Sequence, residues 1–171
     1  MSFNSIPEFS FSLIDNRDPD TISALEYALM THGFFTITDH GIDDDLLSSS
    51  YSMSKKFFAL AEDKKNIYAH PEMGGARGYT PFGKETALGE TTPDLKEFWH
   101  HGPIIDNSYD PRIESNISVV EMPEFNSQFD ELFNDLNLLG MKVLSAIAII
   151  LNKDLNFFDN WVIKGNSLLR L

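Results

Sequence analysis

The stretch Gly33-Phe34-Phe35-Thr36-Ile37-Thr38-Asp39-His40-Gly41-Ile42 decides how this chain folds. Gly33 stands where a helix needs a left-handed terminator, a conformation that a residue without Cβ adopts at little cost. Residues 34–38 are aromatic and β-branched, as in a short buried strand. We therefore predict a helix that ends at Gly33, a strand over 34–38, and a turn in which His40 is a turn histidine rather than a general base.

The segments on either side predict more of a helix-and-strand scaffold. Ile6–Phe11 alternates apolar and polar residues, which predicts a first strand that starts near Pro7 or lies at an edge. Asp18-Pro19-Asp20 predicts a capped helix start. Asp43-Asp44-Asp45 predicts a second helix that runs to about Ala59. One face of this second helix is predicted to carry Leu47, Tyr51, Ser54 and Phe58, with Leu46, Met53 and Phe57 adjacent to it.

The second half of the chain changes character. Residues 69–122 keep no helical period, so we predict short strands or a functional lid there, with one strand at 98–100. After Pro123, apolar residues hold helical spacing to about Leu151, which predicts one long helix. A short helix over 155–161 and a strand over 167–171 complete the prediction.

Composition limits the classes of function. The 171 residues are 42% hydrophobic, which is typical of a globular protein. A formal charge of −13 argues against a nucleic-acid partner. The longest apolar run, Val143–Leu151, is too short to span a bilayer, so we predict no membrane partner. The absence of cysteine excludes disulfides and thiolate metal sites. The first residues lack the pattern of a signal peptide, and we expect a cytoplasmic protein.

One triplet has the spacing of a metal site. His70-Pro71-Glu72, with His100 or His101 as a third ligand, has the residue types of a two-histidine, one-carboxylate Fe(II) centre. Pro71 removes a strand hydrogen bond, however, and metal ligands need a rigid support. We interpret the triplet as a solvated loop, and predict neither a metal site nor a catalytic residue in this chain.

Two further clusters leave alternatives open. Arg77, in a glycine-rich run that matches no phosphate-binding fingerprint, either grips a substrate carboxylate or pairs at the surface with Glu72 or Glu85. The charges in Asp94-Leu95-Lys96-Glu97 either form an acid–base pair or fasten a loop through salt bridges.

Taken together, the ordered segments are more specific than any one of them. The chain resembles the N-terminal region of the isopenicillin N synthase-like branch of the Fe(II)/2-oxoglutarate-dependent oxygenases. The resemblance covers essentially the whole chain, in the order and spacing of that family. The segments that carry it are Ile6-Pro7, Gly33-Phe34-Phe35, His40-Gly41-Ile42, Lys56–Leu60 with Lys64, Arg77-Gly78-Tyr79, Pro93–Trp99 and Gly165–Leu171.

The resemblance implies an α+β chain that belongs to a double-stranded β-helix (jelly-roll) enzyme. In that family a His-x-Asp and a distal His hold Fe(II), and an Arg-x-Ser pair usually binds 2-oxoglutarate. This sequence contains no His-x-Asp. We therefore expect an N-terminal fragment, inactive alone, that binds neither cofactor and has most of its barrel beyond Leu171. The expected division is an N-terminal domain over 1–122, backing helices over 123–164 and the first core strand over 165–171.

The resemblance also implies which residues border a small-molecule substrate. These are Arg77, Tyr79, Phe98, Ser167 and Arg170. The alternative is a non-catalytic, partner-binding module derived from the same family, and a third hypothesis is the metalloenzyme built on His70. The sequence leaves open the substrate, the oligomeric state, the need for 2-oxoglutarate, and the outcome among hydroxylation, desaturation, cyclisation and ethylene formation.

Overall fold

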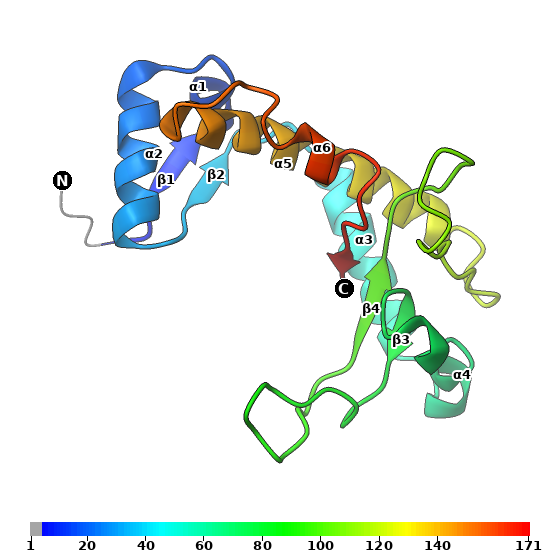
Figure 1. Ribbon diagram of the computed structural model, residues 1–171. Coiled ribbons are helices and arrows are strands. Elements are labelled where there is room, and N and C mark those ends of the chain that lie inside the picture. Colours follow the sequence, from blue (N-terminus) through cyan, green and yellow to red (C-terminus); the bar gives the residue numbers. More distant parts are fainter. Residues whose placement is uncertain (1–4) are drawn as a thin grey trace. The chain divides into compact units, whose positions relative to one another are not determined.

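The computed structural model describes residues 5–171, which form a mixed α+β structure with two small sheets (Figure 1). Contacts divide it into two compact units. Unit 1 takes in the chain up to Ile42 and Asp135–Ile163, and unit 2 takes in Asp43–Asn134 and Lys164–Leu171. These units cut across the division expected at 122/123 and 164/165, which stays a prediction.

Unit 1 contains a parallel strand pair and the helices between its strands. Strand β1 (Glu8–Ser10) pairs with β2 (Thr36–Thr38), Phe9 lying opposite Ile37. Helices α1 (Phe11–Asp15) and α2 (Pro19–Thr31) connect them. The predicted cap is confirmed, since the Asp18 carboxylate accepts a hydrogen bond from the Thr21 N–H at 2.9 Å. Gly33 has φ of +78° after α2, which confirms the predicted helix terminator.

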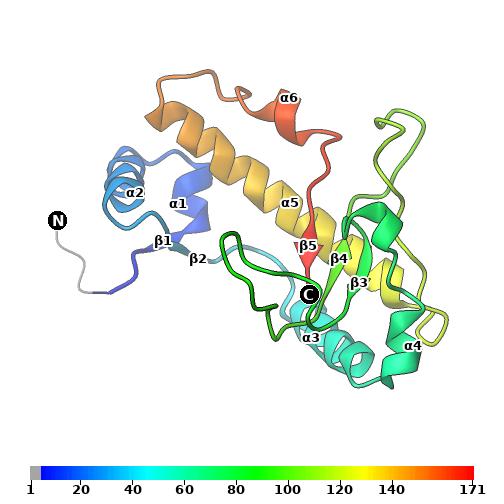
Figure 2. The same ribbon diagram turned by 60° about the horizontal axis from the view of Figure 1, so that its bottom comes forward.

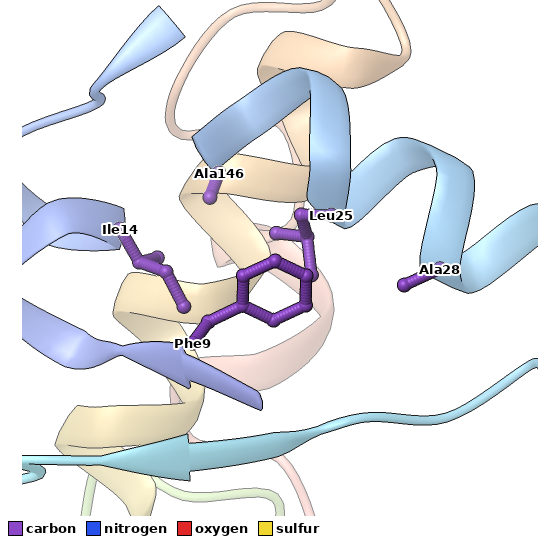
Figure 3. Close-up of a cluster of buried hydrophobic side chains, with 5 residues drawn as sticks. All are labelled: Phe9, Ile14, Leu25, Ala28 and Ala146. Carbon is purple, nitrogen blue, oxygen red and sulfur yellow. The ribbon is translucent and has the colours of Figure 1, made fainter. Parts of the chain in front are cut away.

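The core of unit 1 is apolar. Figure 3 shows the Phe9 ring between the side chains of Ile14 and Leu25. Ala28 and Ala146, the latter from the long helix α5 (Phe125–Ile150), complete this buried cluster. The predicted strand over Ile6–Phe11 is too long, because the chain turns into α1 at Phe11 and thereby places Ile14 in the core.

Unit 2 begins with α3 (Asp44–Phe58), which Asp43 caps by accepting hydrogen bonds from Asp45 N–H and Leu46 N–H. The predicted apolar face is wrong by one position, since Tyr51 is 71% exposed and Ser50 is buried. Ser50 accepts a hydrogen bond from the Gln128 side-chain amide at 3.0 Å, a partner that the local pattern does not reveal. Helix α4 (Glu62–Asn66) and the 3₁₀ turn η1 (Pro71–Met73) follow.

The sheet of unit 2 has three antiparallel strands in the order β3-β4-β5, which lie side by side in Figures 1 and 2. Their bounds are Gly78–Thr80 for β3, Phe98–His101 for β4 and Leu169–Arg170 for β5. The strands predicted at 98–100 and 167–171 are thus confirmed, the second in shorter form. The 81–97 segment between β3 and β4 contains no helix or strand.

The predicted long helix is confirmed as α5 (Phe125–Ile150), and it contributes residues to both units. The helix predicted over 155–161 appears only as α6 (Asp159–Val162), after a run of turns. Unlike the run Val143–Leu151 by itself, α5 is long and apolar enough to cross a bilayer, by length and composition. Core helices of water-soluble proteins meet the same test, so it does not assign a membrane partner.

Candidate functional site

The two faces of the β3-β4-β5 sheet have different chemistry. Successive side chains of a strand point to opposite faces. In β4, Trp99 and His101 therefore share one face, and Phe98 and His100 share the other. The strand register places Tyr79 opposite Trp99 and Arg170 opposite His100.

The Trp99 face is packed with aromatic rings. Trp99 is completely buried, and its ring centroid lies 5.0 Å from that of Phe57 and 4.9 Å from that of Phe125, both in edge-to-face geometry. Phe125 in turn lies 4.6 Å from Phe129. This geometry is favourable for aromatic pairs and adds to the stabilisation from burial. The face is the hydrophobic core of unit 2.

Some buried polar groups on this face are paired, whereas Trp99 Nε1 and His101 Nδ1 have no hydrogen-bond partner among the described residues. The Tyr79 hydroxyl donates to Glu97 at 2.5 Å, and the Lys65 ammonium approaches the same Glu97 oxygen at 2.7 Å. Burial and the Glu97 carboxylate raise the pKa of Tyr79 well above its usual value. The hydroxyl is therefore a neutral donor with a structural partner, while the contact of Tyr79 with substrate stays a prediction.

His101 is completely buried at the end of β4. Its Nε2 lies 2.7 Å from the Asp130 carboxylate of α5 and 3.1 Å from the Asn116 amide nitrogen. Burial lowers the pKa of His101, although Asp130 opposes that effect. The Nε2 contacts of His101 thus link β4 with α5 inside unit 2, and they leave this nitrogen unavailable to a metal ion.

Arg77 lies inside unit 2, with 1% of its surface exposed. Its Nη1 donates to the Ala76 carbonyl at 2.6 Å and its Nη2 donates to the Asn166 side chain at 2.8 Å. A Cβ at Gly102 would fall 2.2 Å from the guanidinium carbon, so glycine makes room for this side chain. The hypothesis of a surface pair with Glu72 or Glu85 is therefore wrong. A substrate contact by Arg77 stays a prediction.

The opposite face of the sheet holds a compact group of Phe98, His100 and Arg170, which we call the Arg170 cluster. The Arg170 guanidinium carbon lies 4.2 Å from the centroid of the Phe98 ring. Its Nε donates to His100 Nε2 at 2.8 Å. Phe98 and His100 are buried, whereas the Arg170 side chain is 50% exposed. The cluster therefore presents one polar group to its surroundings, the outer edge of a guanidinium.

Charges from the 81–97 segment border this cluster. Glu85 lies 2.5 Å from the Lys96 ammonium and 3.7 Å from Arg170 Nη2. Lys96 also pairs with Asp94 at 2.9 Å. The interpretation of these charges as salt bridges that fasten a loop is confirmed. The pKa of Glu85 is lowered, mainly by its hydrogen bond with Lys96.

A cavity of about 800 Å³ adjoins the same part of unit 2. Its wall includes Tyr79, Phe98 and Glu85, together with Gly74 and Gly75. Two of the residues predicted to border substrate therefore line one hollow. Ser167 lies just before β5, half-buried, and stays a prediction.

The interpretation of the His70 triplet as a loop is confirmed, since the triplet lies at the 3₁₀ turn η1 and not on a strand. His70 Nδ1 lies 2.7 Å from Glu72, and the Glu72 side chain is 66% exposed. His100 and His101 have the other partners given above. Within residues 5–171, no group of three metal-ligating side chains is arranged around a common point.

The sequence prediction missed His100 and Glu85 as members of the cluster. The alternation of β4 contained the signal for His100, since it shares a face with Phe98. The register of β5 against β4, which brings Arg170 to His100, links positions 70 residues apart and was not visible.

Comparisons with known proteins agree with this architecture. The family described as "non-haem dioxygenase in morphine synthesis N-terminal" matches residues 6–122. The proline hydroxylase buaE of Petromyces alliaceus is 30% identical over 160 residues, which cover 91% of this chain and 49% of that protein. A 2OG-Fe(II) oxygenase family protein from Caulobacter crescentus superimposes with a TM-score of 0.84 and 37% identity, covering 98% of this chain and 55% of that one.

A full-length Neurospora crassa protein, solved in complex with alpha-KG (2-oxoglutarate) and thymine, matches 96% of this chain and 54% of its own with a TM-score of 0.79 and 27% identity. A related protein thus binds a small molecule together with 2-oxoglutarate. This chain spans about half the length of the relatives it matches. The family match over residues 6–122 and the agreement in fold lead to one conclusion: the chain belongs to the N-terminal region of the Fe(II)/2-oxoglutarate-dependent oxygenase family.

Proposed function

We propose that this chain is the N-terminal part of an Fe(II)- and 2-oxoglutarate-dependent oxygenase that oxidises a small molecule. The observation that carries the proposal is the 37% identity to the Caulobacter crescentus oxygenase-family protein over 98% of this chain. The iron and 2-oxoglutarate ligands are proposed to lie in residues that this chain does not contain. The lack of any His-x-Asp in the sequence supports this part of the proposal.

In the whole enzyme, bound Fe(II) and 2-oxoglutarate together with O₂ would supply the oxidising chemistry, in which one oxygen atom of O₂ goes to succinate as 2-oxoglutarate loses CO₂ and the other goes to oxidation of the small molecule. The residues of this chain would supply a scaffold and one wall of the substrate entrance. The Trp99 face supports the scaffold role, because its interlocked rings fix β3 and β4. Such rigid support is what a substrate-binding surface requires.

The Arg170 cluster would form the substrate-facing part of that wall. Arg170 is half exposed, its Nη2 is too far from Glu85 for a hydrogen bond, and its apolar face already rests on Phe98. A guanidinium in that state can donate to a carboxylate, phosphate or carbonyl oxygen of a ligand. Burial of the Phe98 ring makes this residue a support for Arg170 rather than an open stacking surface.

The test compares two proteins made from the same gene. One contains residues 1–171, and the other continues through the codons that follow Leu171. Each is incubated in air with Fe(II), 2-oxoglutarate and ascorbate, and succinate is measured by mass spectrometry. We expect succinate from the extended protein, no succinate when Fe(II) is replaced by a chelator, and none from residues 1–171.

Succinate production by residues 1–171 would contradict the placement of the ligands. An extended reading frame that lacks a His-x-Asp and a distal His, and that produces no succinate, would contradict the oxygenase function itself.

A further inference from the structure

His100 has two partners of opposite kind, and these partners determine its protonation. Its Nδ1 lies 2.6 Å from the Gly75 carbonyl oxygen, which can only accept a hydrogen bond. Its Nε2 lies 2.8 Å from Arg170 Nε, which can only donate one. Nδ1 must therefore carry the proton and Nε2 must present its lone pair. The geometry is satisfied by the neutral Nδ1–H tautomer alone.

The same contacts restrain Arg170 from two directions. The His100 acceptor holds the inner edge of the guanidinium through Nε, and the Phe98 ring supports its flat face at 4.2 Å. The ring of His100 itself packs on Phe98, with centroids 4.8 Å apart. Arg170 is thereby held in one pose, and a preformed pose lowers the entropy lost when a ligand binds.

We propose that His100 is a positioning residue, whose neutral Nδ1–H tautomer holds Arg170 on Phe98 with its Nη edge free for an acceptor group of the substrate. The inference rests on the proposed function for its substrate, but the positioning of Arg170 is a property of this chain. A protonated His100 would turn Nε2–H toward the Arg170 N–H, so that the acceptor is lost and two positive charges meet.

The charged surroundings of His100 come from three elements. Arg170 on β5 and Arg77 next to β3 disfavour the imidazolium, whereas Glu85 in the 81–97 segment and the Gly75 carbonyl favour it. Burial is the largest effect, and the pKa of His100 is lowered as a result. The neutral form that positions Arg170 is thus the stable form near neutral pH.

Glu85 is the carboxylate inside the chain that could take up the Nη donors of Arg170. Lys96 lies 2.5 Å from Glu85, more than 1 Å closer than Arg170 does. Lys96 therefore offsets much of the Glu85 charge, and Arg170 keeps donors for an external acceptor. Because Glu85 interacts with both Lys96 and Arg170, the 81–97 segment has an electrostatic interaction with the Arg170 cluster.

The experiment follows the Arg170 Nε–H proton by ¹H–¹⁵N NMR in the chain of residues 1–171. Its exchange with water is compared with that of Arg17, which is exposed in unit 1. We expect exchange about tenfold slower at Arg170, as for a protected hydrogen bond. The imidazole ¹⁵N shifts should show a protonated Nδ1 and a bare Nε2. Acidification slows intrinsic N–H exchange at both arginines, so the measured quantity is the protection of Arg170 relative to Arg17, which should be lost as His100 takes up a proton.

Two variants separate positioning from general packing. His100→Asn keeps a short donor near Gly75 but lacks an atom that can reach Arg170. His100→Gln keeps an acceptor oxygen near the position of Nε2. Relative to Arg17, we expect no protection of Arg170 in H100N, and protection that is not lost on acidification in H100Q.

Equal behaviour of the two variants, unchanged protection in H100N, or a protonated Nε2 at neutral pH would each overturn the proposal. Disordered spectra in H100N leave H100Q, the ¹⁵N shifts and the acid dependence of the unsubstituted chain to decide it. None of these measurements requires turnover. An extended protein that lacks a His-x-Asp and a distal His, and that produces no succinate, would therefore contradict the oxygenase function without affecting the result for His100.

Discussion

The two units bury different kinds of side chain. In the described part of unit 1, the core around Phe9 and Leu25 is apolar, and Thr21 is its one buried polar residue. Unit 2 buries several polar or charged side chains beside its aromatic rings, namely Ser50, Lys65, Arg77, His100 and His101. Buried polar groups cost free energy unless their hydrogen bonds are made, but when satisfied they fix geometry. Unit 1 is therefore held together by apolar burial, whereas the core of unit 2 also holds polar side chains in fixed positions.

The largest test of this comparison is Arg77→Ala. The substitution would leave a cavity against Gly102 and would remove the donors of the Ala76 carbonyl and the Asn166 side chain. We expect the free energy of unfolding to fall by about 3 kcal/mol. Urea denaturation measures it. The matched control is Arg112→Ala, because that arginine is 88% exposed, and we expect no measurable change. Equal effects of the two variants would show that Arg77 is not a structural centre of unit 2.

Two glycines with nearly the same backbone angle, one in each unit, allow the cost of adding a Cβ to be compared between the units. Gly78 in unit 2 has φ of +77°, and Gly33 in unit 1 has φ of +78°. A Cβ on Gly78 would fall 2.6 Å from the Tyr68 carbonyl, whereas one on Gly33 meets open space. We expect Gly33→Ala to cost about 1–2 kcal/mol from backbone strain alone, and Gly78→Ala to cost clearly more. Similar losses in thermal unfolding would remove the contrast in packing.

Stability in acid should depend on the two buried histidines of unit 2, His100 and His101, because the pKa of each is lowered. The pKa of His101 is lowered in the folded protein, so below about pH 6.5 this histidine binds a proton more readily in the unfolded chain than in the native one. The free energy of unfolding therefore falls as pH drops through this range, by at most about 1.4 kcal/mol per pH unit for this group.

His101→Gln should reduce the pH dependence of stability between about pH 6.5 and 5, measured by urea denaturation at each pH, while His100 keeps its own contribution. The unsubstituted chain, measured in parallel at each pH, gives the reference slope. An unchanged slope in H101Q would mean that His101 does not resist protonation.

The smallest expected effect is that of Tyr79→Phe. The change removes the hydroxyl that donates to Glu97 and leaves the Lys65–Glu97 pair in place. We expect a loss of about 1 kcal/mol, the usual net value of one hydrogen bond. Tyr51→Phe on α3 is the control, since Tyr51 is 71% exposed. A loss in Y51F as large as in Y79F would argue that the buried network adds no stability.

The parts of the fold that depend on neighbouring residues could be predicted from the sequence. Asp18 and Asp43 cap helices a few positions away, and Gly33 terminates one through its own backbone angle. The buried face of α3 was missed by one position because Ser50 is covered by Gln128, a residue 78 positions away. Local periodicity has no access to such a partner.

The residues of the candidate site also divide into those that the sequence could predict and those that it could not. Phe98 and Arg170 were proposed from the resemblance, and the structure brings them together across β4 and β5. The burial of Arg77 depends on Gly102 and Asn166, and the role of His100 depends on strand register. Both depend on contacts between residues far apart in the sequence. The sequence could therefore indicate that these residue types suit a binding site, but it could not indicate which side chains contact each other.

The central claim is that this chain supports an iron-dependent oxygenase without holding the iron itself. Anaerobic equilibrium dialysis with Fe(II) tests it most directly, comparing residues 1–171 with the protein that continues past Leu171. We predict no saturable iron on residues 1–171 and one iron per extended chain. One tightly bound iron on residues 1–171, lost on substitution of His70 or His100, would contradict the account.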